Sequence, residues 1–410
     1  MLQLRPLPGD EGQLLKQIEN KVRATANELA PSASENQRRL IFLNGNFNHD
    51  PDVAGLLASL YPQMGRGDRV AALVYNSYWR WLYRLFNHLG IRRGSLPVSF
   101  LTRADLINIS SLSFFEVVRS RPVAFYPFRT LGLGNLLNRL LAATPVLRWA
   151  GFSEVVILRP RRPSAGALSL SVIVPARNER GNIRGALERL PDFGAKCEVI
   201  FVEGHSTDGT WEEIEKLRAE FGPRLEISAY RQPGIGKADA VREGIRHARN
   251  ELVTILDADL TVPPEQLLQF HRAFQSGVAD FVNGNRLIYP MEGGAMRFLN
   301  WVGNLLFARM LSFVLDCQLG DTLCGTKLFL RSDYGRFLHW RKRFGDFDPF
   351  GDFELLFPAA ELGLGITDLP VRYGARAYGA TSIRRFAHGI RLLKMVASGF
   401  WKIRVGSADA

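Results

Sequence analysis

Two aspartates separated by one alanine end an apolar run of the chain. The run 252–259 reads LVTILDAD, and residues two apart in a strand project to the same face, so we expect Asp257 and Asp259 to leave the strand's carboxyl end together. Two carboxylates at one point suit a divalent cation, Mg²⁺ or Mn²⁺, that carries a diphosphate. The alternative is an acidic strand end that serves only to cap the next helix.

Polar residues also follow another apolar run, 169–176. Arg177, Asn178 and Glu179 come directly after it, and we interpret them as contacts to the ribose and base of a nucleotide. The alternative is helix capping, with Asn178 as the cap of a helix that starts near residue 182. The residue types alone leave both interpretations open.

Two more segments supply candidate contacts to a base and a phosphate. Glu203 lies near the end of the run 197–204 and is the candidate contact to a nucleobase, whereas Asp208 is favoured as a turn and N-cap residue. Gly236 and Lys237 open a predicted helix, where glycine permits close backbone approach and lysine can meet a phosphate at the positive helix end. A plain glycine-rich turn is the alternative, and the spacing of a P-loop is absent.

A later pair of acids, Asp352 and Glu354, could supply a general base. One of them could accept a proton from an acceptor hydroxyl, or contact the acceptor or the metal. Their alternative role is that of acids favoured by the helix dipole at a helix N-terminus.

Strands and helices must alternate to place these residues together. After the Pro- and Arg-rich linker 161–167, apolar runs alternate with amphipathic ones, which predicts a mostly parallel α/β sheet covered by helices on both faces. The expected strands are 169–176, 197–204, 225–231 and 252–259, and the expected helices are 182–190, 210–221 and 237–250. Ligands bind beyond the carboxyl ends of such strands, so the polar clusters are expected to converge on one edge.

The segment before the linker, 1–160, is predicted to be a smaller α/β domain. We expect a helical start over 11–29, and the domain that follows the linker spans 168–410. The predicted strands of the first domain are 39–45, 69–75 and 153–160, and the predicted helices are 52–63 and 79–90.

Composition sets the broad class of the protein. The 410 residues are 46% hydrophobic and 22% charged, which is typical of a globular chain long enough for two domains. The three cysteines form no CxxC motif, which favours reduced thiols in a reducing compartment, and the mixed, charged start of the chain is unlike a signal peptide.

The net charge of +12 is unevenly distributed along the chain. Between Val371 and Val405 there are eight arginines or lysines and no acid, and apolar residues recur at helical spacing. This pattern predicts helices that lie in a membrane interface near 382–405 and near 298–317, with packing against the protein's own core as the alternative. Polar residues interrupt the stretch near 298–317 and disfavour a helix that spans the membrane. No sequence motif of a nucleic-acid-binding domain is present.

From about residue 168 to 404 the chain resembles the family 2 glycosyltransferases of the GT-A fold, in the branch of dolichyl-phosphate mannose synthases and polyprenyl-phosphate glycosyltransferases. The resemblance rests on VIVPARNE, VEGHSTDGT, GKADA, LDADLTVPPE, VNGNRL, DTLCGTKLF and PVRYGARAYGATSIRRFAHGIRLLK, in that order. It implies a nucleotide pocket lined by Pro175, Asn178, Glu179 and Glu203, and a metal held by Asp257 and Asp259. It also implies that Arg286, Arg376 and Ser382 lie near the acceptor or the phosphates.

The chain departs from this family at two places. Glu203-Gly204-His205 stands where the family usually has two aspartates and a glycine, so the identity of the nucleotide stays open. A basic motif of the family loses its lysine in RAYGATSIR, so Arg384 or Arg385 would supply the charge there.

A second resemblance concerns the first domain. Residues 38–160 resemble the second half of a class I methyltransferase-like fold, without the glycine-rich half that binds S-adenosylmethionine. We therefore expect no methyl transfer, and a structural or partner-docking role.

Together these features predict a metal-dependent, inverting transfer of a sugar from a nucleotide-sugar to a polyprenyl phosphate. The enzyme would be peripheral on the cytoplasmic face of the membrane. A lipid phosphate needs cations such as Arg286 and Arg376 rather than a base. One alternative is transfer to a glycan hydroxyl with Asp352 as general base. Another is a non-catalytic binding protein on a transferase scaffold.

Overall fold

The protein divides into two compact units. The structure, a computed structural model, describes residues 1–4, 24–26, 28–30, 38–91, 96–126, 133–145, 147–290, 298–344, 351–376, 378 and 385–405. The first unit is Met1–Arg162 with Arg404–Ala410, and the second is Pro163–Ile403. The boundary falls at the predicted linker, but the segment from Arg404 onward groups with the first unit rather than with the predicted domain 168–410.

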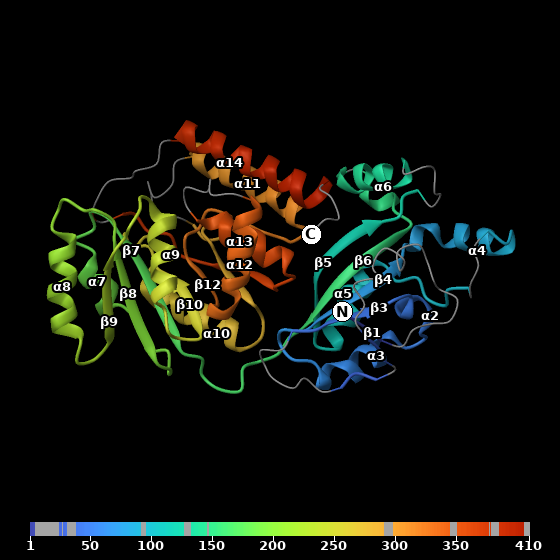
Figure 1. Ribbon diagram of the computed structural model, residues 1–410, viewed down its shortest axis with the longest axis horizontal. Coiled ribbons are helices and arrows are strands. Elements are labelled where there is room, and N and C mark those ends of the chain that lie inside the picture. Colours follow the sequence, from blue (N-terminus) through green and yellow to red (C-terminus); the bar gives the residue numbers. More distant parts are fainter. Residues whose placement is uncertain are drawn as a thin grey trace. The chain divides into compact units, whose positions relative to one another are not determined.

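A seven-stranded sheet organises the second unit, in the order β13-β11-β12-β10-β7-β8-β9 (Figure 1). Neighbouring strands are parallel except that β12 is antiparallel to both β10 and β11. The mostly parallel sheet predicted from the sequence is therefore confirmed. Its strands are β7 (Leu170–Ala176), β8 (Cys197–Glu203), β9 (Glu226–Arg231), β10 (Leu252–Ile255), β11 (Phe281–Asn285), β12 (Lys327–Leu330) and β13 (Ile366–Pro370).

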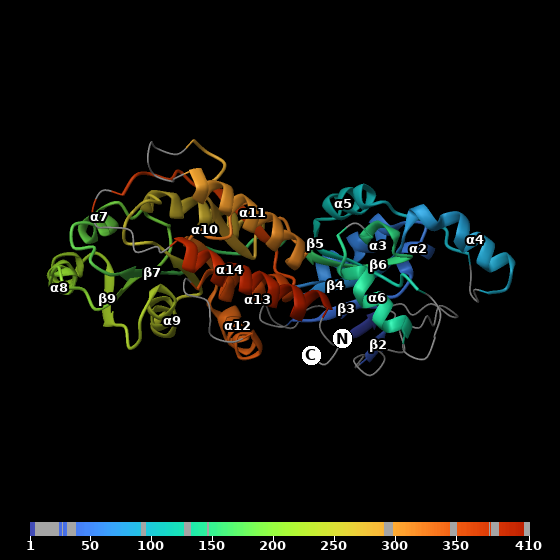
Figure 2. The ribbon, with the colours of Figure 1, turned by 90° about the horizontal axis from the view of Figure 1, so that it is seen from above.

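Helices cover both faces of this sheet (Figure 2). Ile173 and Val253 contribute to the core on one face, while Val172 and Leu252, their neighbours in the chain, contribute to the core on the other. Each fully buried side chain of this kind stabilises the fold by about 1.5–3 kcal/mol. The first face packs against α9 (Lys237–His247), α11 (Phe298–Leu315), α12 (Arg331–Phe344), α13 (Asp352–Glu361) and α14 (Arg385–Gly399), and the second against α7 (Ile183–Glu188), α8 (Thr210–Phe221) and α10 (Leu267–Gln275).

The strand that leads to the two aspartates is shorter than the sequence predicts. β10 ends at Ile255, and the Leu256 N–H makes one more bond to the Ile173 carbonyl at 2.9 Å. The chain then turns, with Leu260 at a φ of 54°. The prediction that Asp257 and Asp259 project from the strand itself is therefore wrong, because both lie on the turn that follows it.

The topology explains which segments meet at one edge. Since β7, β8, β10 and β11 run parallel, their carboxyl ends lie at the same edge of the sheet. Because β12 runs the other way, its first residue, Lys327, lies at that edge opposite Asn283 of β11. The residues that follow β7, β8, β10 and β11 thus lie at the same edge as Lys327, the first residue of β12.

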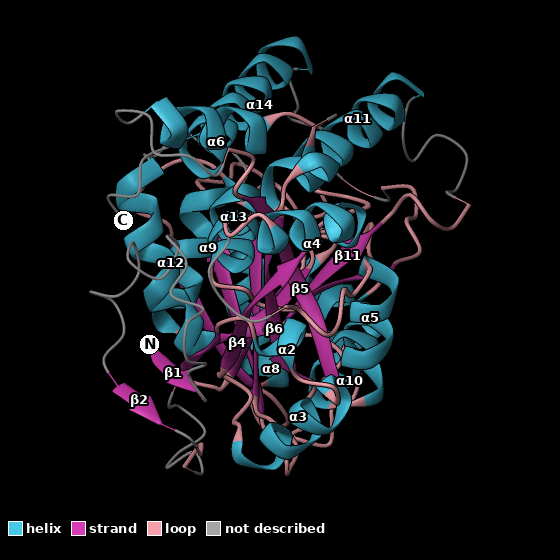
Figure 3. Ribbon diagram, turned by 90° about the vertical axis from the view of Figure 1, so that its right-hand side faces the viewer, coloured by secondary structure: helices cyan, strands magenta, loops and turns pink. Residues whose placement is uncertain are grey.

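A six-stranded sheet, in the order β2-β1-β3-β4-β6-β5, organises the first unit (Figure 3). Its strands are β1 (Leu2–Leu4), β2 (Ala24–Ala26), β3 (Leu40–Leu43), β4 (Arg69–Tyr75), β5 (Phe115–Val123) and β6 (Ser153–Pro160). β6 lies antiparallel between β4 and β5. The strands predicted at 39–45, 69–75 and 153–160 are present, whereas β5 was not expected.

The helices of the first unit pack chiefly on one core. Phe47, Leu57 and Leu106 from three helices bury against strand residues such as Val70 and Leu158. The helical prediction over 11–29 is wrong at Ala24–Ala26, which forms a strand, and 11–23 lies outside the described residues.

The helices of the first unit are α2 (Asn46–His49), α3 (Val53–Leu60), α4 (Arg80–His88), α5 (Arg103–Leu112) and α6 (Leu133–Ala143). Short 3-10 turns η2 (Tyr61–Gln63), η3 (Ser77–Trp79) and η4 (Arg148–Ala150) join them, η5 (Pro264–Gln266) precedes α10, and a π-helical segment, η6 (Phe400–Val405), follows α14.

Candidate active site

Asp257 is held by the lysine that opens α9. Lys237 and Asp257 form an ion pair, and both side chains are partly exposed. Gly236 precedes the helix with φ 96° and ψ 163°, a conformation that other residues rarely adopt. Burial alone would lower the pKa of Lys237, but the nearby carboxylates of Asp257 and Asp352 outweigh it and raise that pKa. A β-carbon at Gly325 would collide with the Lys237 amine and the Asp257 carboxylate, so a larger residue there would displace the ion pair.

Asp259 is held by a different cation, Arg376. The Arg376 Nη2 donates to Asp259 Oδ2 at 2.5 Å, and its Nη1 donates to Glu179 Oε1 at 3.3 Å. Asp259 Oδ1 accepts from the Thr261 backbone N–H at 3.1 Å. Burial raises the pKa of Glu179, although the Asn182 amide and Arg376 act against it. Arg376 therefore joins a predicted metal ligand to a predicted nucleotide contact.

The segment after β7 is fastened to the segment after β8. Asn178, at a φ of 55°, accepts from the Thr207 N–H at 2.9 Å and donates its own N–H to Ser206 Oγ at 2.9 Å. The N-cap residue of α7 is Asn182, so Asn178 does not cap that helix. Arg177 is exposed at the same edge. The capping alternative for Asn178 is wrong, and its structural role is to join two loops.

The two strand ends themselves carry Pro175 and Glu203. Pro175 lies within β7 and pairs with Val202 of β8. Glu203 is buried and accepts the Ser206 N–H. Asp208 accepts the Thr210 N–H at 3.1 Å, which confirms its predicted role in the turn, but the predicted N-cap role is wrong because Gly209 is the N-cap residue of α8. Glu203 is thus at the expected edge, with part of its carboxylate already engaged.

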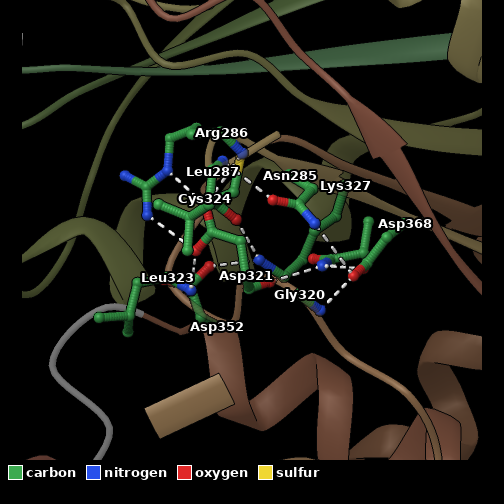
Figure 4. Close-up of polar contacts among 11 residues, drawn as sticks. Asn285, Arg286, Leu287, Gly320, Asp321, Leu323, Cys324, Lys327, Asp352 and Asp368 are labelled. Atoms are coloured by element: carbon green, nitrogen blue, oxygen red, sulfur yellow. Dashed lines mark hydrogen bonds and ion pairs between the residues drawn. The ribbon is translucent and has the colours of Figure 1, made fainter. Parts of the chain in front are cut away.

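Arg286 is fixed by a buried aspartate that the sequence did not single out (Figure 4). Its Nε and Nη2 donate to the two carboxylate oxygens of Asp321 at 2.6 and 2.9 Å. Its guanidinium also lies 5.3 Å from the centre of the Tyr373 ring. Such a bidentate pair fixes both the position and the plane of the guanidinium.

Asp352 is paired with a lysine that is inaccessible to solvent. Lys327 Nζ lies 2.6 Å from Asp352 Oδ1 and also donates to the Cys324 carbonyl (Figure 4). Asp352 opens α13 after Gly351, whose φ is 81°. A buried lysine is costly unless a carboxylate and further hydrogen bonds compensate it, so the pair fixes the start of α13 against β12. Lys327 was not predicted, although a lysine that opens the apolar strand KLFL is a detectable signal.

These ion pairs share one electrostatic environment. Burial alone would raise the pKa of Asp257, but Lys237 lowers it, and Lys327 and Arg286 act in the same direction. The net direction is downward, so Asp257 is ionised at neutral pH. Most of the predicted site residues of the second unit therefore gather around the turn that follows β10.

Three predicted residues receive no side-chain description. Ser382 and Arg384 lie outside the described residues, and Arg385 opens α14 without a described side chain. Their predicted contacts to the acceptor stay predictions.

Helices α11 and α14 expose apolar side chains. Phe298 and Leu299 are each 73% exposed, and Ile390 and Leu393 of α14 are also exposed. Among the described residues, α11 is the one helix long and apolar enough to cross a membrane by length and composition, which is weak support for a membrane location. A third of it is buried in the protein.

Comparisons with known proteins agree with this picture. Residues 171–337 match the model of glycosyl transferase family 2. The dolichyl-phosphate hexose transferase of Haloferax volcanii is 29% identical over 230 residues, which are 55% of this chain and 92% of that protein. The dolichol-phosphate mannosyltransferase of Saccharomyces cerevisiae is 38% identical over 104 residues, which are 24% of this chain and 38% of that protein.

Solved structures are more distant. A mannosyltransferase from Pyrobaculum calidifontis in complex with GDP-Man and Mn²⁺ has a TM-score of 0.39 at 22% identity, over 59% of this chain and 66% of that one. A TM-score of this size does not support assigning the roles of that protein's residues to residues of this chain. Over residues 171–337 the chain is thus similar to the family 2 glycosyltransferases, and its curated relatives include dolichyl-phosphate hexosyl- and mannosyltransferases.

Proposed function

We propose that the protein transfers a sugar from a nucleotide-sugar to a polyprenyl phosphate of the dolichyl type, at a membrane surface and with a divalent metal. One observation carries the proposal: at a single sheet edge, Arg376 joins Asp259 to Glu179 while Lys237 holds Asp257. Carboxylates and cations that contact each other can exchange partners when a metal and a diphosphate enter. The same edge then provides both ligands for a metal and charges for phosphates.

The donor set suits Mg²⁺ or Mn²⁺. Asp257 and Asp259 offer hard oxygen atoms on partly exposed side chains, and both would hold the ion. Among the described residues no group of three or more metal-binding side chains gathers, so water and the diphosphate would complete the coordination. A divalent cation there would stabilise the charge that develops on the leaving diphosphate.

The nucleotide would lie over the ends of β7 and β8. Glu179 and Glu203 are buried at those ends, where they can accept hydrogen bonds from ribose hydroxyls and a base. Lys237 can donate to a phosphate from the N-terminus of α9, where the helix dipole adds to its charge. Pro175 and Arg177 would complete the pocket.

A lipid phosphate is the acceptor that fits the remaining charges best. It is already ionised at neutral pH, so it needs cations that position it rather than a base. Arg286 is held in one plane by Asp321, and Arg376 is the nearest counterion of Asp259. Oδ1 of Asp352 is occupied by Lys327 instead of facing a hydroxyl, which argues against transfer to a glycan.

The reaction would invert the configuration at the sugar. An oxygen of the lipid phosphate forms the new bond to C1 while the bond from C1 to the diphosphate breaks, and its electron pair leaves with the diphosphate. A retaining mechanism would need a free carboxylate as nucleophile. Asp257 and Asp259 would be bound to the metal, and Asp352 is bound to Lys327, so none of the three would serve as the nucleophile and direct displacement is favoured.

The exposed apolar side chains of α11 and α14 would place the second unit in the membrane interface. Leu393 of α14 and Trp401 of η6 are exposed, and Lys394 adds positive charge for anionic headgroups. The donor would come from the cytoplasmic side, where nucleotide-sugars are made.

Two variants distinguish the lipid acceptor from a glycan hydroxyl. Replacing Arg376→Ala should reduce transfer of labelled sugar to polyprenyl phosphate about 100- to 1,000-fold, the range for losing a donor to developing charge. Asp352→Asn should be milder, because a phosphate needs no general base. Arg372→Ala, at an exposed arginine on the same segment, is the matched control and should keep full activity. Loss with Asp352→Asn and near-normal activity with Arg376→Ala would favour the glycan.

A further inference from the structure

Helix α4 of the first unit exposes an apolar surface that neither the family match nor the proposed function uses. We call this surface the α4 patch, and in Figure 1 the helix is the labelled α4 ribbon beyond the ends of β3 and β4. No residue of α4 is buried. The patch consists of Tyr78, Trp81, Leu85, Leu89 and Ile91, with exposed fractions of 72, 60, 41, 57 and 58%.

The opposite face of the helix fixes its orientation. The Tyr83 ring stacks on Tyr75 with centroids 4.8 Å apart, and its hydroxyl donates to the Phe152 carbonyl at 2.7 Å. Trp81, Leu85 and Leu89 are spaced four residues apart and therefore share one side of the helix. Single exposed apolar residues are ordinary, but five within fourteen residues form a surface that needs a partner.

Charge identifies the class of partner. From residue 69 to residue 104 the sequence has six arginines and no acidic residue, and Arg80 and Arg84 are exposed on α4 itself. A second copy of the chain in a two-fold contact would oppose these like charges. Tryptophan and tyrosine concentrate at membrane interfaces, and a basic amphipathic helix with such residues lies in the headgroup region.

We propose that the α4 patch lies in the interface of an anionic lipid bilayer and attaches the first unit to it. Trp81, Leu85 and Leu89 would enter the boundary between headgroups and acyl chains, while Arg80 and Arg84 would contact lipid phosphates. The attachment is independent of sugar transfer, because it involves no residue of the active site.

A local probe separates this surface from α11 and α14. Cys197 and Cys317 are first replaced by serine, while Cys324 is buried and stays. An environment-sensitive fluorophore is then attached to Leu85→Cys in the full chain, and vesicles of phosphatidylcholine with or without phosphatidylglycerol are added. The matched control carries the fluorophore at Ile107→Cys, an exposed apolar position on α5.

Emission at position 85 should shift to the blue and rise several-fold with anionic vesicles, and emission at position 107 should stay unchanged. Arg80→Gln and Arg84→Gln should each weaken vesicle affinity about fivefold, as expected for a basic residue at an anionic surface. No change at position 85 would overturn the proposal. A blue shift without vesicles that grows with protein concentration would also overturn it, in favour of a second copy of the chain.

Discussion

The carboxyl ends of the parallel strands carry different chemistry in the two units. In the second unit Glu203 ends β8, Asp257 and Asp259 follow β10, and cations hold the two aspartates. In the first unit the ends of β3 and β4 are followed by amides, Asn44 and Asn76. Similar layouts of strands and helices thus end in ionised groups in one unit and in neutral groups in the other.

Two amides near these strand ends, Asn48 and Asn76, are bound to backbone. Asn48 donates to the Leu73 carbonyl at 3.0 Å and accepts the Tyr75 N–H at 2.8 Å, and Asn76 donates to the Gly151 carbonyl at 2.7 Å. Side chains bound to backbone cannot change partners without disturbing the fold. Ion pairs between side chains can, which is why we assign the chemistry to the second unit and a scaffold role to the first.

The largest effect is expected at Asp257. Asp257→Asn removes a proposed metal ligand and should lower transfer about a thousandfold, since a catalytic cation contributes several kcal/mol. Mn²⁺ binding in the presence of a nucleoside diphosphate, followed by electron paramagnetic resonance, should weaken in parallel. Asp52→Asn, at the N-cap of α3 in the first unit, is the control and should affect neither. Unchanged Mn²⁺ binding in Asp257→Asn would show that the aspartate is not a ligand.

Lys327→Met tests whether a buried ion pair supports the active edge. The change leaves Asp352 buried without its cation and should lower the free energy of unfolding by about 3–5 kcal/mol in denaturant titrations. The double variant Lys327→Met with Asp352→Leu should recover most of this stability, and its transfer activity should fall no further than that of Asp352→Asn. Full activity of the double variant would exclude the pair from any part in catalysis.

Asn48→Ala tests the scaffold side of the comparison. It leaves the Leu73 carbonyl and the Tyr75 N–H without partners and should cost about 1–3 kcal/mol of unfolding free energy. The rate of sugar transfer per folded molecule should stay unchanged. A lower rate at full folding would mean that the amide edge takes part in the reaction.

The smallest effect is expected on the pH dependence of the unfolding free energy. Burial alone would raise the pKa of Asp321, but the Arg286 guanidinium outweighs it and holds that pKa below its usual range. Because the folded-state pKa is the lower one, this stabilisation is complete above the unfolded value of about 3.9 and is lost as the pH falls further. Unfolding free energies measured between pH 6 and 3 should therefore fall less steeply in Asp321→Asn than in the unaltered protein.

Hydrophobic periodicity predicts much of the second unit because its strands are buried and its helices amphipathic. The helix expected over 210–221 is α8. The strand β5 was missed because FEVVRSRPV contains charges and a proline that resemble a loop. The early end of β10 was missed because the strand ends at a local turn, whereas the apolar pattern continues beyond it.

The residue types of the candidate site were predictable, but their partners were not. Asp257 and Asp259 stand out by spacing alone, whereas the pairing of Arg376 with Glu179 joins residues 197 positions apart. The partners of Asp321 and Lys327 became visible only when the fold placed β11 beside β12. The likeness of the first unit to a methyltransferase fold stays a prediction.

The central claim is that the carboxyl edge of the second unit moves a sugar onto a lipid phosphate. The direct measurement incubates the full chain with labelled nucleotide-sugars, Mg²⁺ or Mn²⁺ and polyprenyl phosphate, and counts the label that enters the organic phase. We predict one labelled, lipid-soluble product that requires both the lipid phosphate and the metal and disappears with a chelator. Label that stays on a water-soluble glycan, or a lipid product that forms equally well with a chelator, would contradict the account.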